Sequence, residues 1–170
     1  KLIINYSGRL KKRKGLDLII NLIKHYKNDK AIFFIFCGFT EKDLFKYVKS
    51  RYKNTQCFGF VDDINYFLQR SDITLLPSLH EGLPYVILES MLNKSLVIAN
   101  NIPGIRSIVK NNYNGFLINN NDLNLYIKSI DEVKKNKLKF KKTLQNGFKT
   151  VRKYDRKTFL EKYINFLTKI

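Results

Sequence analysis

The chain has 170 residues, 44% of them hydrophobic and 27% charged, and its formal net charge is +18. This length allows one domain with a sizeable core, and the composition is that of a soluble globular protein. The longest apolar runs are of strand length, which argues against a signal peptide and against a membrane-spanning helix.

Six short apolar runs predict β-strands, and helical patterns separate them. The strands are expected at residues 2–6, 31–37, 55–58, 72–76, 96–99 and 115–118. This alternation predicts a Rossmann-like α/β fold, in which a parallel six-stranded sheet has helices on both faces and right-handed crossovers.

After residue 119 the pattern changes to helices only, expected at residues 122–133, 137–152 and 155–170. The carboxyl-terminal end is therefore predicted to be all-helical. Two apolar stripes follow these helices: Val133, Phe140, Leu144, Phe148 and Val151, and then Leu160, Tyr163, Ile164 and Leu167.

A basic run follows the first predicted strand. Gly8 opens a turn, Arg9 comes next, residues 11–14 read KKRK, and apolar residues at helical spacing begin a helix at Leu16. Ligands of open α/β sheets collect just beyond the carboxyl ends of strands, so Arg9 and Lys14 are candidates for binding an anion. The alternative is a solvated basic loop.

The segment after the fourth predicted strand has the features of a helix that begins at a ligand. Pro84 suits the first helical position, where its missing N–H costs nothing. Gly82 lets the backbone approach a ligand. The unpaired N–H groups of Leu83, Tyr85 and Val86, together with the positive end of the helix dipole, predict a phosphate site.

Two carboxylates flank this helix start. Glu81 precedes the helix and Glu89 lies about one and a half turns inside it, so they are expected to contact different parts of one elongated ligand. Because a diphosphate repels carboxylates, sugar hydroxyl groups are their better partners. Alternatively, Glu81 is a solvated loop residue and Glu89 a helix-surface charge. His80 either contacts the ligand or fills the loop.

Four segments, in order and at matching spacings, carry a family resemblance. The segment at the helix start reads HEGLPYVILE, and the segment at the basic run reads YSGRLKKRKGLDLII. The helix-start segment is preceded by FGFVDDINYFLQRSDITLLPS and followed by IPGIRSIVKNNYNGFLI. All four resemble segments of the retaining family 4 (group 1) glycosyltransferases, which have the two-domain GT-B fold. The first resembles the family's signature of Glu, seven residues and Glu, and the four cover most of residues 2–118.

The resemblance implies a role for each matching position. Arg9 and Lys14, after Gly8, would neutralise the diphosphate of a nucleotide-sugar donor. Glu81 would hold hydroxyls of the transferred sugar near its reacting carbon, and these three are the expected catalytic residues. Fixed cations lower the barrier because the leaving diphosphate gains negative charge in the transition state.

The remaining donor contacts implied by the resemblance lie along the same site. The ribose hydroxyls would bind Glu89, and the nucleobase would face backbone groups around Phe60 and Val61. Phosphate or sugar would meet the loop at His80, Gly82, Leu83 and Pro84.

The chain departs from the family pattern at two places. Ser107 stands where members usually carry a Glu, and Gly38-Phe39-Thr40 replaces a more glycine-rich turn. These departures leave the shape of the donor pocket open, and with it the identity of the nucleotide and the sugar.

Because a complete GT-B enzyme has two domains, the resemblance implies that residues 1–170 are a single domain, the carboxyl-terminal donor-binding half. The amino-terminal acceptor domain is absent from the chain, which begins at Lys1 and whose only methionine is Met91. The implied reaction transfers a hexose from a UDP- or GDP-linked donor to a lipid or glycan acceptor, with retention of configuration, in cell-surface glycan or glycolipid synthesis. No cofactor and no protein-bound metal are expected. The half alone should bind donor but transfer poorly.

Two other classes of function stay open: a non-catalytic nucleotide-sugar-binding module, and a basic interaction domain for membrane or nucleic acid. Residues 131–170 hold 13 basic and 4 acidic side chains, a net +9 that is half of the total charge. No nucleic-acid motif accompanies them, so nucleic acid is not an expected partner. Attraction to an anionic membrane surface is the more economical hypothesis, with a Lys-rich solvated face as its alternative.

Cys37 and Cys57 lie at the ends of apolar strand runs without metal-type spacing, which indicates small buried thiols in a reducing cytoplasm. The expected location is therefore cytoplasmic, and the membrane hypothesis extends it to a peripheral position at the inner face of the cell membrane. The abundance of Lys, Asn and Ile hints at AT-rich coding and a bacterial source.

Overall fold

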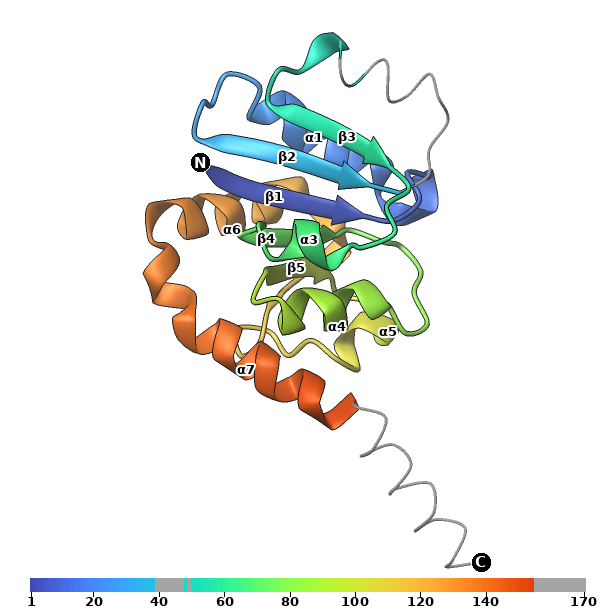
Figure 1. Cartoon of the computed structure of the whole chain (residues 1–170), viewed down its shortest axis with the longest axis vertical. Helices are drawn as coiled ribbons and strands as arrows, with labels where there is room; N and C mark the ends of the chain where they lie inside the picture. The colour runs from blue at the N-terminus through green and yellow to red at the C-terminus, as the bar shows by residue number, and fades with distance from the viewer. Residues whose placement is uncertain (39–47, 49, 155–170) are drawn as a thin grey trace, which may run out of the picture.

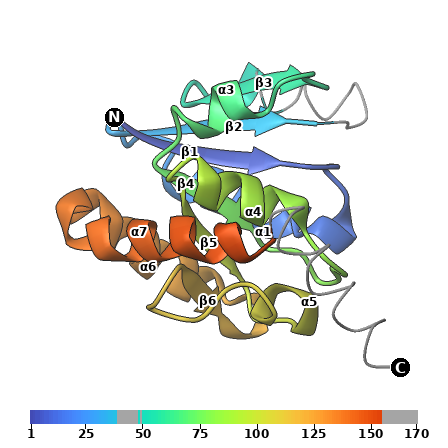
Figure 2. The same cartoon turned by 60° about the horizontal axis from the view of Figure 1, so that its bottom comes forward.

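The computed structural model describes residues 1–38, 48 and 50–154, so the helix predicted at residues 155–170 lies outside the described part. Six parallel strands form one sheet in the order β3-β2-β1-β4-β5-β6 (Figures 1 and 2). All six predicted strands are confirmed to within one residue at each end: β1 Leu2–Ser7, β2 Ile32–Cys37, β3 Thr55–Gly59, β4 Ile73–Leu76, β5 Leu96–Asn100 and β6 Phe116–Ile118.

The strand order reverses between β1 and β4. From β1 the chain runs outward through β2 to β3, and it then returns to β4 on the other side of β1 and continues to β5 and β6. The connections that leave β1 and β4 at the carboxyl edge of the sheet therefore lead to helices on opposite faces. Such a switch point is where open α/β sheets bind ligands.

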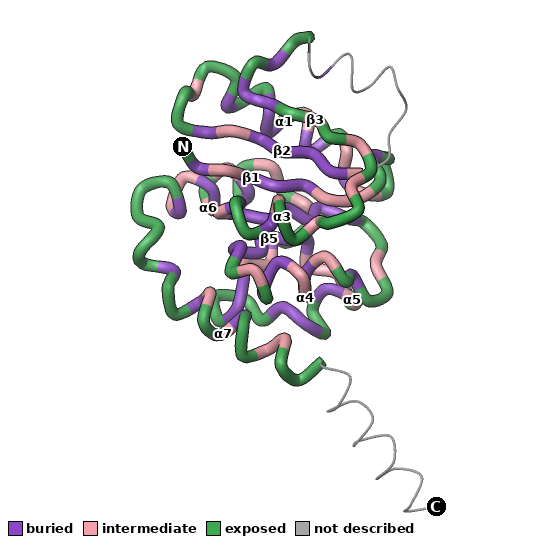
Figure 3. Tube along the Cα trace, viewed as in Figure 1, coloured by how far each residue is buried: buried purple, intermediate pink, exposed green. Residues whose placement is uncertain are grey.

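Alternation along the strands divides the core into two layers. Ile4, Ile73 and Ile98 pack in the layer that contains α1 (Leu16–His25) and α6 (Leu123–Lys135). Val97 and Ala99 pack in the layer that contains α4 (Tyr85–Leu92) and α5 (Pro103–Arg106), with α7 (Lys141–Val151) beside α4 (Figure 2). The strands are largely buried between these layers, and the outer helical turns are exposed (Figure 3). Helices therefore cover both faces, as predicted.

The helices after residue 119 differ from the prediction in one respect. The helix predicted at 122–133 is α6, whose Asp122 accepts hydrogen bonds from the N–H groups of Asn124 and Leu125 at 2.7 and 3.1 Å. The single helix predicted at 137–152 is wrong, because a 3₁₀ turn at Lys137–Phe140 precedes α7. The side chain of Asn136 accepts the N–H of Lys139 at 3.3 Å and tightens this turn.

The apolar stripe predicted on these helices is buried at its start and opens toward its end. Val133 and Phe140 are buried, and Leu144 packs against the same core. Val151 packs against the other core, whereas Phe148 is 37% exposed. The second stripe lies outside the described residues.

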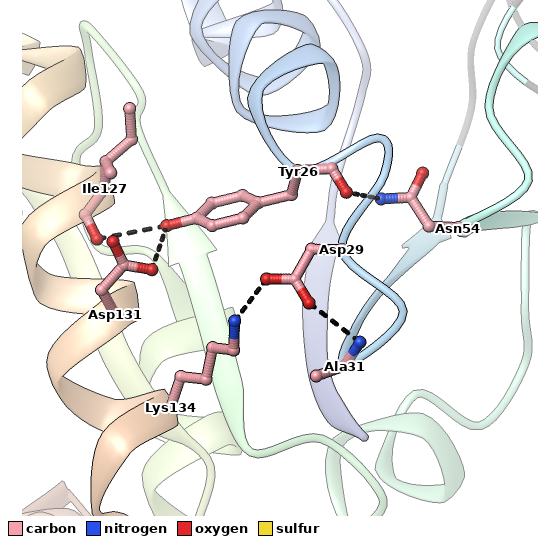
Figure 4. Close-up of polar contacts among 7 residues, drawn as sticks. All are labelled: Tyr26, Asp29, Ala31, Asn54, Ile127, Asp131 and Lys134. Atoms are coloured by element: carbon pink, nitrogen blue, oxygen red, sulfur yellow. Dashed lines mark hydrogen bonds and ion pairs between the residues drawn. The ribbon is translucent and has the colours of Figure 1, made fainter.

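A polar network joins α1 to α6 at the amino end of the sheet (Figure 4). The buried hydroxyl of Tyr26 donates to Asp131 Oδ1 at 3.0 Å, with the carbonyl of Ile127 at 3.2 Å as a second acceptor. Lys134 forms an ion pair with Asp29 beside it. Burial, and then the hydrogen bond to Asp131, raises the pKa of Tyr26, so this hydroxyl remains a donor. The network stabilises the end of the domain opposite the switch point.

We expect Tyr26→Phe to lower the free energy of unfolding by about 1 kcal/mol, because it removes one buried hydrogen bond and little volume. Tyr113→Phe is the matched control, since the Tyr113 side chain is 50% exposed and its loss should cost less than about 0.5 kcal/mol. Urea unfolding of both variants measures the difference. Equal effects would show that the network contributes nothing measurable.

Candidate functional site

Two loops meet beyond the carboxyl ends of β1 and β4. One runs from Gly8 to Gly15 and contains the basic run, and the other leads from β4 to α4 (Figure 1). The N–H of Leu79 in the second loop donates to the carbonyl of Arg13 in the first at 2.9 Å. The structure thus brings the two strongest sequence candidates, the basic run and the segment around Glu81, to one place.

Gly15 makes this meeting possible. Its backbone has φ +79°, and a Cβ at this position would lie 2.2 Å from the carbonyl oxygen of Pro77. Both the left-handed conformation and the close backbone contact require glycine. Lys14 is consequently held next to the loop that follows β4.

Lys14 and Glu81 form an ion pair with Nζ and Oε1 2.6 Å apart. The two side chains are only 22% and 10% exposed, so the pair is partly withdrawn from solvent. The sequence predicted separate contacts for these residues, one to phosphate and one to sugar, and did not predict that they touch. Their pairing offsets the negative charge with which Glu81 alone would repel an anion.

Tyr6, on β1, supports the basic loop through its hydroxyl group. Its buried hydroxyl donates to the carbonyl of Arg9 at 3.0 Å, and the carbonyl of Lys14 lies 3.4 Å away. Burial, and then the negative charge of Glu81, raises the pKa of Tyr6, so the hydroxyl keeps its proton and its role as donor. Sequence reasoning missed this residue. The available signal was a tyrosine near the end of a buried strand, whose hydroxyl needs a partner.

Gly104 fixes the turn that contains Glu81. A Cβ on Gly104 would lie 2.1 Å from the carbonyl oxygen of Glu81 and 2.5 Å from that of Gly82. The start of α5 therefore packs directly on this turn, which the sequence did not indicate. Gly82 has open space around its own Cβ direction, with nothing within 4 Å, as a position facing a ligand requires.

The start of α4 corrects one prediction. Pro84 is not the first helical residue: it has φ −77° and ψ 97°, precedes the helix, and accepts the N–H of Ile87 at 3.0 Å through its carbonyl. Its extended ψ follows from the turn held by Gly104. Among the described residues, no acceptor is found for the N–H groups of Leu83, Tyr85 and Val86. These donors remain available to an anion, as expected.

Glu89 lies half-buried on α4 without a contact to Glu81, as the spacing predicted. Burial raises the pKa of its carboxyl group above the ordinary value. Its carboxylate makes no hydrogen bond or ion pair with the described residues. A half-buried carboxylate without a partner differs from the solvated surface charge that was the alternative interpretation.

The other predicted residues lie at the same edge of the sheet. Arg9 and His80 are exposed, and Gly8 has φ +148° and donates its N–H to the carbonyl of Cys37 at 2.9 Å. Phe60, which is 63% exposed, and Val61 follow β3. Within the described part of the chain, neither the Arg9 side chain nor the His80 side chain forms a hydrogen bond or ion pair with Lys14 or Glu81.

The two departures from the family pattern are less informative. Ser107 ends α5 and donates its hydroxyl to the carbonyl of Gly104 at 2.8 Å. Gly38 approaches Gly8 so closely that a Cβ would lie 2.2 Å from the carbonyl oxygen of Gly8. Phe39 and Thr40 lie outside the described residues.

A doubly wound parallel sheet with a cationic loop and a helix amino terminus at its switch point is an arrangement typical of ligand-binding α/β domains. Residues 1–150 match the family described as "Glycosyl transferases group 1". The chain therefore belongs to the group 1 glycosyltransferases, and its fold is that of the carboxyl-terminal half of a GT-B enzyme, as the sequence indicated.

Individual relatives agree with this assignment. The UDP-Gal:alpha-D-GlcNAc-diphosphoundecaprenol alpha-1,3-galactosyltransferase of Escherichia coli is 34% identical over 110 residues, which are 61% of this chain and 28% of that protein. The carboxyl-terminal domain of a group 1 glycosyltransferase (LpcC) from Francisella tularensis superposes with a TM-score of 0.78 and 26% identity, over 92% of this chain and 87% of that one. HepE from Anabaena, solved with UDP, has a TM-score of 0.86 and 20% identity, over all of this chain and 49% of that one.

The described residues contain neither a membrane-spanning helix nor a metal-binding cluster. None of their helices has the length and hydropathy that crossing a bilayer requires. No group of three or more His, Cys, Asp or Glu residues in that part of the chain is placed to hold a metal ion.

Gly104→Ala should lower the free energy of unfolding by about 1–3 kcal/mol, because its methyl group would overlap the carbonyl oxygens of Glu81 and Gly82. Gly82→Ala is the control, because the same methyl group meets open space there and should be neutral or stabilising by up to about 1 kcal/mol. Thermal or urea unfolding distinguishes the two. A neutral Gly104→Ala would contradict the close contact between α5 and the turn.

Glu89→Gln should stabilise the free domain at neutral pH. Burial raises the pKa of Glu89 in the folded state above the ordinary value of 4.5, so the unfolded state loses its proton first as the pH rises. At a pH above both pKa values the ionised, half-buried carboxylate lowers the free energy of unfolding. The advantage of the variant should therefore be present near pH 7 and disappear below about pH 4. Unfolding curves at both pH values test this, and a destabilised variant at pH 7 would contradict it.

Proposed function

We propose that this chain is the donor-binding half of a retaining hexosyltransferase that uses a nucleotide-diphospho-sugar, with UDP as the nucleotide. The observation that carries the proposal is the ion pair of Lys14 and Glu81 at the switch point, beside the free N–H groups at the start of α4. The names of the relatives support the choice of nucleotide, since one is a UDP-Gal transferase and another was solved with UDP.

The diphosphate is proposed to bind between the basic loop and α4. Arg9 is exposed and free to turn its guanidinium toward a phosphate, and Lys14 is already held in place by its neighbour Gly15. The free N–H groups and the helix dipole supply the opposite side. A site with donors on both sides stabilises the charge that develops on the leaving diphosphate.

Glu81 is proposed to bind hydroxyls of the transferred sugar. Only one of its oxygens is engaged by Lys14, so the other can accept a sugar hydroxyl while the lysine also contacts phosphate. Lys14 would then bridge the sugar-binding and phosphate-binding parts of the site. We assign Glu81 no role as a nucleophile, because its proposed task is to orient the sugar near the reacting carbon.

Glu89 is proposed to bind the ribose hydroxyls. Backbone groups near Phe60 are proposed to bind the base. A ribose would supply the hydrogen bonds that the half-buried Glu89 carboxylate lacks among the described residues. His80 and the turn of Gly82, Leu83 and Pro84 complete the proposed donor contacts.

The acceptor site belongs to a part that this chain does not contain. The chain spans 28% of the Escherichia coli relative and 49% of HepE. A lipid-linked or glycan acceptor, bound by an amino-terminal domain, is proposed by analogy with the diphosphoundecaprenol substrate named for that relative. The corresponding location is the cytoplasm at the inner face of the membrane, where the basic carboxyl-terminal region would meet anionic lipid. Alone, the chain should bind donor and transfer poorly.

Donor binding is tested by calorimetric titration of the chain with UDP-, GDP-, ADP- and TDP-sugars. We expect one UDP-sugar to bind, and Lys14→Met to weaken it by about 10- to 100-fold, the cost of one charge-assisted hydrogen bond. Lys12→Met is the matched control, because Lys12 is exposed in the same basic run and should change the affinity by less than about threefold.

Three results would count against the proposal. Equal losses in the two lysine variants would indicate unspecific attraction by the basic run. Preference for a GDP-, ADP- or TDP-sugar would overturn only the choice of UDP as the nucleotide and not the donor-binding function. Absence of binding to every donor by a folded chain would overturn the donor-binding function itself.

A further inference from the structure

Two asparagines hold the loop between β4 and α4 on the side away from the basic run. Asn100 is the last residue of β5, and Asn121 ends a 3₁₀ turn, Asn119–Asn121, directly after β6. Asn100 Nδ2 donates to the carbonyl of Ser78 at 3.0 Å, and Asn121 Nδ2 donates to the carbonyl of Pro77 at 3.0 Å. Two consecutive carbonyls of the loop are therefore bound by side-chain amides, one from the end of β5 and one from the turn after β6.

The two asparagines are also bound to each other. The N–H of Asn121 donates to Asn100 Oδ1 at 3.2 Å, so the contacts form one connected network across β4, β5 and β6. Asn100 is 5% exposed and Ser78 is fully buried. In a water-poor environment a lost donor leaves a carbonyl without a partner, so each amide matters to the position of the loop.

The backbone at Asn121 is shaped for this contact. Asn120 and Asn121 have φ values of +53° and +54°, two successive left-handed residues that are not glycine. Asparagine tolerates this conformation better than most residues, but it persists only where the surroundings determine it. Here it turns the chain sharply after β6, and it directs the side chain of Asn121 toward the Pro77 carbonyl and the N–H of Asn121 toward Asn100 Oδ1.

The carbonyl of Pro77 is thereby contacted from two sides. Asn121 donates to it, and the α-carbon of Gly15 lies so close that a Cβ would be 2.2 Å away. Gly15 follows Lys14 directly, and Pro77 precedes Glu81 by four residues. A shift of the Pro77 peptide would therefore displace both members of the ion pair.

We infer that Asn121, together with Asn100, is a positioning residue for the donor: it fixes the Pro77–Ser78 backbone so that Lys14 and Glu81 meet the diphosphate and the sugar. The inference rests on the proposed donor-binding function. It has a specific consequence, because the loop contacts the diphosphate and sugar and not the nucleoside. Loss of the Asn121 amide should weaken a UDP-sugar and leave UMP unaffected.

The test compares two changes at Asn121 with the same changes at Asn112. Asn121→Asp keeps the side-chain size but replaces the donor by a carboxylate oxygen facing the Pro77 carbonyl, and Asn121→Gly removes the amide while allowing φ +54°. Asn112 is the matched control, because it has φ +60° and an exposed side chain with no contact to this loop. Thermal unfolding of each variant first establishes that it is folded at the titration temperature.

UMP and the UDP-sugar that the unchanged chain binds are then titrated, by NMR and by calorimetry. We expect both Asn121 variants to bind the UDP-sugar about tenfold or more weakly and UMP within about twofold, with the Asn112 variants unchanged for both ligands. Unchanged UDP-sugar affinity, or equal losses for UMP and UDP-sugar, would overturn the positioning role. If neither Asn121 variant folds, Asn100→Asp decides by the same titrations.

The two proposals fail in different ways. Absence of UDP-sugar binding by the unchanged chain would overturn the proposed function, and this inference with it. Binding by the unchanged chain together with insensitive Asn121 variants would overturn only the inference.

Discussion

The close contact between Gly15 and the carbonyl of Pro77 is the constraint on which the site depends. It brings two loops from adjacent strands within hydrogen-bonding distance, although they are about 60 residues apart in sequence. Only a residue without a side chain allows this approach, and the same residue must adopt a left-handed conformation. These two loops are also held by the ion pair of Lys14 and Glu81, by the hydrogen bond from the Tyr6 hydroxyl and by the hydrogen bond from the Asn121 side chain.

The ion pair resolves an electrostatic conflict. A binding site for a diphosphate should be positive, whereas recognition of sugar hydroxyls favours carboxylates. In the proposed donor site, pairing Glu81 with Lys14 would keep an acceptor for the sugar and remove the net repulsion of the phosphates. Glu89 is different, because its half-buried carboxylate has no such partner among the described residues and burial raises its pKa.

Much of the fold could be predicted because a parallel sheet buries both faces of its strands and leaves short continuous apolar runs. The six runs, from Leu2 to Ile118, matched six strands to within one residue. The single helix predicted through Phe140 was wrong, because the side chain of Asn136 accepts the backbone N–H of Lys139 and no periodicity of apolar residues indicates that contact. Pro84 was displaced by one position for a similar reason, since Gly104 determines the turn before it.

The sequence by itself determined the fold class, the family and the identity of the loops that form the candidate site, because these depend on periodicity, turn residues and local motifs. Only the tertiary structure decided that Lys14 pairs with Glu81 and that Tyr6 and Gly104 support the two loops. It also decided that Asn100 and Asn121 donate hydrogen bonds to the carbonyls of Ser78 and Pro77. Tyr6 bonds only to the loop that follows its own strand. The other contacts join residues more than 20 positions apart, and they are set by the packing of strands and helices and not by any local pattern.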